Sequence, residues 1–101
     1  MTQYRQGDVM LLKVAELPRG AQKQPPAERI VLAYGEVTGH AHAVPTEHAV
    51  LYRAEDATYL NVLHPTGLTH EEHTRIDLQP GVYKVVLQRE YTPERNRLVA
   101  D

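Results

Sequence analysis

Residues that favour turns recur along this chain at intervals of about 8 to 12 residues, which limits the length of any element between them. No window longer than about ten residues keeps apolar side chains at helical spacing without an interrupting Pro or Gly. The intervening segments are instead rich in Val, Leu, Ile, Tyr and Thr, residues that favour strands. We therefore expect strands at 9–14, 29–33, 40–44, 49–53, 58–63, 74–78 and 82–91.

The expected fold class is all-β. Short antiparallel strands in a chain of 101 residues can bury an apolar face by closing into a small barrel or by packing as a two-sheet sandwich. We expect a single β domain over residues 1–101, because a second core would need roughly another 50 residues. A Pro-rich excursion at 15–28 is expected to form an arm or a flap, and a charged C-terminal tail follows at 92–101. Because so small a core is only marginally stable, we also expect a homo-oligomer.

Composition excludes several classes of chemistry. The chain has no Cys and no Ser, so disulfides, thiolate metal sites, iron–sulfur clusters and Ser or Cys nucleophiles are excluded. The N-terminal segment is polar and the longest apolar run is Val9 to Leu12, so we expect no signal peptide, no membrane contact and a cytoplasmic location.

Charge argues against nucleic acid as the partner. The formal net charge is −2, and acidic residues alternate with the arginines near the C-terminus. The side chains that an RNA surface would use are Tyr83, Arg89, Tyr91, Arg95 and Arg97. Because they form no continuous basic stripe, we do not expect nucleic-acid binding.

The six histidines are the unusual part of the composition. In a strand, residues i and i+2 point to the same face, so His40 and His42 project together. Two imidazoles on one face suit a divalent ion, and Glu47, beyond the turn at Pro45, would add a carboxylate from the next strand. The alternative for both histidines is hydrogen bonding to backbone carbonyls or pairing with a carboxylate.

A second group is the phrase His70-Glu71-Glu72-His73. If the segment is one continuous strand, His70 shares a face with Ile76 and Leu78, and His73 faces the other way. If the four residues form a helical turn, His70 and His73 meet on one face. We expect His70 to be the inward group, and whether His73 or Glu72 joins it stays open. The remaining histidines, His48 and His64, are expected at exposed turn positions.

These motifs resemble the two metal motifs of the cupin superfamily over residues 35–74. The matching positions are Gly35, His40, His42 and Glu47, then Pro65, Gly67 and His70. The resemblance implies a double-stranded β-helix in which His40, His42, Glu47 and His70 bind one divalent metal. The phrases at 35–43 and 70–73 also resemble a group of small bacterial and phage-borne proteins of unknown activity.

The sequence therefore favours a cytoplasmic β-barrel protein that binds Zn²⁺, Mn²⁺ or Fe²⁺ through His40, His42 and His70. Borderline ions of this kind suit imidazoles with an oxygen ligand, and Glu47 or Glu72 would supply the oxygen or act as a general base. Such a protein is either a metal-dependent enzyme of unidentified substrate or a metal-binding module. The competing interpretation is a non-enzymatic homo-oligomeric interaction module.

Overall fold

A computed structural model describes residues 3–35, 39–55 and 57–88. These residues form ten strands and one short 3₁₀ turn. The elements are β1 (Gln3–Gln6), β2 (Val9–Val14), β3 (Gln22–Lys23), β4 (Arg29–Tyr34), β5 (Ala41–Pro45), η1 (Thr46–His48), β6 (Ala49–Ala54), β7 (Ala57–Val62), β8 (Thr66–His70), β9 (His73–Leu78) and β10 (Gly81–Leu87). Within these ranges no helix has the length and apolarity needed to cross a membrane.

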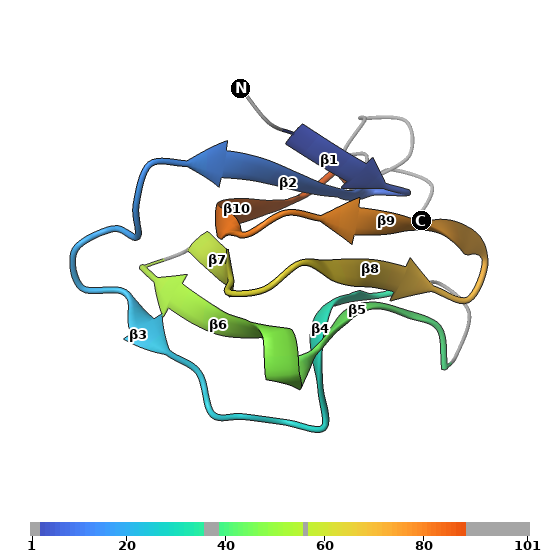
Figure 1. Cartoon of the computed structure of the whole chain (residues 1–101), viewed down its shortest axis with the longest axis horizontal. Helices are drawn as coiled ribbons and strands as arrows, with labels where there is room; N and C mark the ends of the chain where they lie inside the picture. The colour runs from blue at the N-terminus through green and yellow to red at the C-terminus, as the bar shows by residue number, and fades with distance from the viewer. Residues whose placement is uncertain (1–2, 36–38, 56, 89–101) are drawn as a thin grey trace, which may run out of the picture.

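The strands form two antiparallel sheets, shown in Figure 1. The six-stranded sheet has the order β1-β2-β10-β7-β6-β3, and the four-stranded sheet has the order β4-β5-β8-β9. The all-β prediction is confirmed, and the two-sheet arrangement is the one observed. The expectation of a closed barrel is wrong for the described residues, because no ladder of backbone hydrogen bonds joins the edge strands of one sheet to those of the other.

A single apolar core lies between the two sheets. Side chains from both contribute to one cluster: Val9, Leu11, Ile30, Ala33, Val44, Ala49, Leu60, Val62, Leu68, Leu78 and Tyr83. In β2 the buried side chains of Val9 and Leu11 are two residues apart, as expected for a strand with one face on the core. Burial of these side chains is the main force that holds the sheets together.

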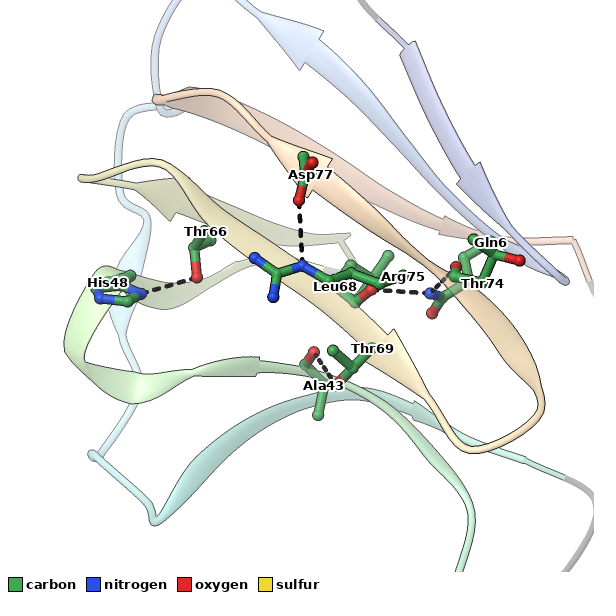
Figure 2. Close-up of polar contacts among 9 residues, drawn as sticks. All are labelled: Gln6, Ala43, His48, Thr66, Leu68, Thr69, Thr74, Arg75 and Asp77. Atoms are coloured by element: carbon green, nitrogen blue, oxygen red, sulfur yellow. Dashed lines mark hydrogen bonds and ion pairs between the residues drawn. The ribbon is translucent and has the colours of Figure 1, made fainter.

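Three strands were not expected from the sequence. They are β1, the two-residue β3 and β8. Pro65-Thr66-Gly67 is typical of a turn, whereas Gly67 lies inside β8, where Arg75 from β9 lies across it and a side chain at residue 67 would displace the guanidinium. Figure 2 shows Arg75 lying over β8, where its Nε donates to Asp77. Glycine in a strand typically marks such a close approach.

Two strands carry register shifts that shape the molecule. In β4 the pairing with β5 shifts between Val31 and Ala33, and in β8 the pairing with β9 shifts between Leu68 and His70. A bulge bends its strand and increases the local twist. In the second shift Thr74 and Arg75 of β9 lie opposite Thr69 of β8, so the extra residue is in β9, directly after the β8–β9 turn.

The Pro-rich excursion at 15–28 is tied to the six-stranded sheet. Its short strand β3 pairs with β6, with Gln22 opposite Arg53 and Lys23 opposite Tyr52. The tail at 92–101 and the final part of the expected strand 82–91 lie outside the described residues, as do the three arginines and Tyr91 considered for RNA contact.

Candidate metal centre

Four of the six histidines gather at one end of the molecule. His40 immediately precedes β5, His42 lies within β5, His70 ends β8 and His73 begins β9. The ring of His70 is central, with centroid distances of 4.3 Å to His42, 4.6 Å to His73 and 5.6 Å to His40. The two strands of the β8–β9 hairpin join through Glu71 and Glu72, so His70 and His73 pair opposite each other.

This hairpin differs from both sequence interpretations. The segment is neither one continuous strand nor a helical turn, and the tight turn brings His73 to the same cluster as His70. The expected convergence of His40, His42 and His70 is observed in part: the His70 ring contacts those of His40 and His42, but His40 and His42 belong to separate groups of potential ligands.

His42 is held by a buried amide from the other sheet. Gln6, 3 % exposed at the end of β1, donates from Nε2 to the carbonyl oxygens of Leu68 at 2.9 Å and Thr74 at 3.0 Å. Figure 2 shows Gln6 reaching these two strands. Because carbonyls only accept, the amide orientation is fixed and Oε1 faces His42 Nδ1 at 2.8 Å. Nδ1 must then carry a proton, so Nε2 is the nitrogen of His42 that a cation would bind.

The carboxylate of Asp8 lies beside this nitrogen. Asp8, in the β1–β2 turn, places Oδ1 3.4 Å from His42 Nε2. A ring nitrogen lone pair and a carboxylate oxygen that face each other repel unless a cation lies between them. A proton on His42 Nε2 or a bound metal ion would remove this repulsion, so the Asp8 carboxylate favours a positive charge at this position.

One trio of histidines has the geometry of a metal site. His42, His70 and His73 each offer a ring nitrogen, and these three atoms lie within 4.8 Å of one another. In a tetrahedral zinc site with bonds of about 2.0–2.1 Å, the ligand atoms are about 3.3 Å apart. The three imidazoles therefore need only a modest contraction to bind one ion.

A second, overlapping trio consists of His40, His70 and Glu71. His40 Nδ1 is buried without a hydrogen-bond partner, and it lies 3.5 Å from Glu72 Oε2. Glu71 accepts a hydrogen bond from the Ala41 amide at 2.9 Å. This bond and that from its own amide lower the pKa of the Glu71 carboxyl, desolvation opposes them, and His40 and His70 lower it further when they carry a proton.

His70 makes a hydrogen bond that an ion would replace. The backbone N–H of Glu72 donates to His70 Nδ1 at 3.0 Å. In a neutral imidazole with this bond, the proton is on Nε2 and neither nitrogen is available to a metal. An ion bound at Nδ1 displaces the amide, and an ion bound at Nε2 moves the ring proton to Nδ1. Either way the Glu72 amide loses its acceptor.

Two glycines make room for the imidazoles. A Cβ at Gly7, in the β1–β2 turn with φ of +59°, would lie 2.7 Å from His73 Nε2. A Cβ at Gly35 would lie 2.9 Å from His70 Nε2. Real Cβ atoms do not approach so closely, so a side chain at either position would displace the imidazole that it meets.

The structure does not bring Glu47 to the cluster. Glu47 is exposed in η1, at the end of β5 away from His40, and belongs to neither trio. His48 beside it is half-buried rather than exposed, because its Nδ1 pairs with Thr66 Oγ1 at 2.8 Å. His64 is exposed in the turn before β8, as expected.

Sequence reasoning did not assign Gln6 and Asp8 to the site. Both lie more than 30 residues before His42 in the chain, and the packing of β1 against β9 is what brings them there. The short phrase Gln6-Gly7-Asp8, which is typical of a turn, was the available signal.

Together, these features define a two-sheet antiparallel β protein with a histidine cluster where the end of one sheet meets the other. A family model described as a domain of unknown function (DUF8820) matches residues 5–88, so the chain belongs to this family. The match includes the whole histidine cluster. No curated protein and no solved structure gave a significant match to the chain.

Proposed function

We propose that this protein binds one divalent transition-metal ion, Zn²⁺, Mn²⁺ or Fe²⁺, at His42, His70 and His73. The observation that carries the proposal is the approach of three ring nitrogens from separate strand positions to within 4.8 Å of one another. The chain has no thiolate, so the donors are imidazole and carboxylate, which suit these borderline ions.

The surroundings of His42 support a metal more than a structural role. Metal-binding histidines almost always donate their second ring N–H to an oxygen, which fixes the tautomer. Gln6 Oε1 provides that oxygen for His42, and the Asp8 carboxylate lies 3.4 Å from His42 Nε2, where it would stabilise positive charge. A purely structural histidine does not need a neighbouring carboxylate and two more imidazoles.

Of the residues that match the cupin motifs, His42 and His70 belong to the proposed ligand set, whereas His40 belongs to the other trio and Glu47 to neither. We extend the proposal to a metal-dependent enzyme, since three protein ligands leave a coordination position for water or substrate in catalytic zinc sites. When bound, the ion would supply Lewis acidity for hydrolytic chemistry. Asp8, beside His42, is the carboxylate that would accept a proton there.

Metal content tests the proposal directly. The protein is purified without a His-tag, stripped with chelator and titrated with Zn²⁺ and Mn²⁺ by calorimetry. We expect one ion per chain, and a His42→Ala/His73→Ala variant should bind at least about 100-fold more weakly. Single His40→Ala and His73→Ala variants separate the two trios, because each removes a residue that the other trio lacks.

The matched control is His48→Ala/His64→Ala, which removes two histidines outside the cluster whose rings are 6.3 Å apart. It should retain full affinity. Equal loss in both double variants, or no saturable binding by the wild-type chain, would contradict the metal proposal and favour the homo-oligomeric interaction module.

A further inference from the structure

The Pro-rich excursion covers a cavity at the opposite edge of the sandwich from β1 and β9. Strand β6 of the six-stranded sheet and strand β4 of the four-stranded sheet are not hydrogen-bonded to each other, so the two sheets separate there. Figure 1 shows the chain running from β3 around this edge to β4. The space enclosed is about 400 Å³, within the range of small-molecule sites.

The roof of this cavity is anchored at both ends. At one end the backbone N–H of Gln24 donates to the carbonyl oxygen of Leu51 at 2.9 Å. At the other end Thr46 Oγ1 donates to the Ala27 carbonyl at 2.6 Å. Between these two bonds lie Pro25 and Pro26, whose φ angles are fixed by their rings. The cavity is therefore preformed, which lowers the entropic cost of binding.

The floor of the cavity is apolar. Ile30 and Ala49, two of its lining residues, belong to the core cluster, so the floor is continuous with the core. Val31 and Leu51 add further apolar surface from the two facing strands. Tyr34 also lines it although 67 % exposed, the largest exposure among the large hydrophobic side chains of the described residues.

The charged residues that line the cavity have one sign. Among the described lining residues they are Lys23 and Arg29, both exposed, and no acidic side chain joins them. An apolar floor with two exposed cations in the lining is complementary to a molecule with an apolar body and one anionic group. A cationic ligand would meet repulsion at the same place.

We propose that this cavity binds a small amphipathic carboxylic acid, with its apolar chain between β4 and β6 and its carboxylate at Lys23 and Arg29. The inference does not depend on the metal proposal, because the cavity and the histidine cluster share no residue. It gives the excursion a role as the fixed cover of a ligand site.

Amide chemical shifts can test this proposal with decanoate as the probe, below its micelle concentration. We expect saturable shifts at residues of β4, β6 and the segment 23–27, and decyltrimethylammonium should bind at least about tenfold more weakly. Lys23→Gln and Arg29→Gln should each weaken decanoate binding by about five- to tenfold. Arg53→Gln is the matched control, since Arg53 is an exposed cation on β6 outside the cavity.

A second variant tests the cavity rather than the charge. Val31→Trp places a large ring in the space between the strands, and circular dichroism shows whether the fold is retained. A folded Val31→Trp protein should bind decanoate at least about tenfold more weakly. Undiminished binding by that variant overturns the proposal, as do equal affinities for decanoate and decyltrimethylammonium or no binding at about 1 mM decanoate.

Discussion

Replacing Gln6 with Met should affect both the stability of the fold and the chemistry of His42. Methionine is similar in length and fills the same space, but it removes the amide that bonds to Leu68, Thr74 and His42. The substitution therefore removes the hydrogen bonds of this side chain while it keeps most of its packing. It also removes the group that holds the proton on His42 Nδ1.

The expected magnitude follows from the three lost bonds. Each hydrogen bond contributes about 1 kcal/mol net, and a buried group left without a partner costs about 1–3 kcal/mol. Gln6 is 3 % exposed and its bond to Leu68 is buried, so the free energy of unfolding should fall by about 3–5 kcal/mol. This is a large part of the roughly 5–15 kcal/mol that holds a domain folded. Affinity for Zn²⁺ should also fall, by about 10- to 100-fold.

Urea unfolding followed by circular dichroism measures the first effect, and ¹⁵N NMR of the His42 ring reads its tautomer. Gln3→Met is the control, because Gln3 is exposed on the same strand. The reasoning is refuted if Gln6→Met unfolds within about 1 kcal/mol of Gln3→Met and His42 keeps its proton on Nδ1.

Three more outcomes are expected. Gly7→Ala and Gly20→Ala both place a side chain at positive φ, at +59° and +87°, but only Gly7 faces His73. Only Gly7→Ala should therefore weaken Zn²⁺ binding in calorimetry, and equal effects of the two substitutions would exclude the steric argument. Addition of Zn²⁺ should speed hydrogen exchange of the Glu72 backbone N–H, because this group donates to His70 in the structure without metal. Unchanged protection of the Glu72 N–H would show that His70 is not a ligand. Burial raises the pKa of Tyr83 from 10.0 to about 12. The stability that the neutral phenol provides is therefore complete below pH 10 and is lost as the pH rises toward 12. The difference between the urea midpoints at about pH 9 and about pH 11 should be smaller in Tyr83→Phe than in the wild-type protein.

Most strands were predictable because their cause is local. The segment 9–14 is the strand Val9–Val14 without change, and the other expected strands agree with the structure within a residue or two at most described ends. The missed strand Thr66–His70 depends instead on a tertiary contact, since Arg75 covers Gly67 only after β8 and β9 have paired. Turn residues alone could not distinguish this glycine from one in a loop.

The candidate site was likewise predictable only where its cause is local in the sequence. The two-residue period of a strand predicts that His40 and His42 lie close together; both rings do contact His70, although His40 precedes β5. The role of His73 depends on the tight turn at Glu71 and Glu72, and the contact of Gln6 with His42 joins residues 36 apart in the chain. Glu47 shows the opposite error, because it is close to His42 in sequence and carries a suitable carboxylate but lies away from the cluster. It belongs to η1, which follows the end of β5 that is farther from His40 and leads into β6.

The bulge in β4 has a consequence for how copies of this protein can meet. β4 is the outer strand of its sheet, and an outer strand with regular backbone invites pairing with a strand from another molecule. The register shift between Val31 and Ala33 twists this strand and interrupts the row of hydrogen-bonding groups in its middle. Extension of the sheet from one copy into the next is therefore disfavoured at β4, and the chain is protected there against fibrous aggregation.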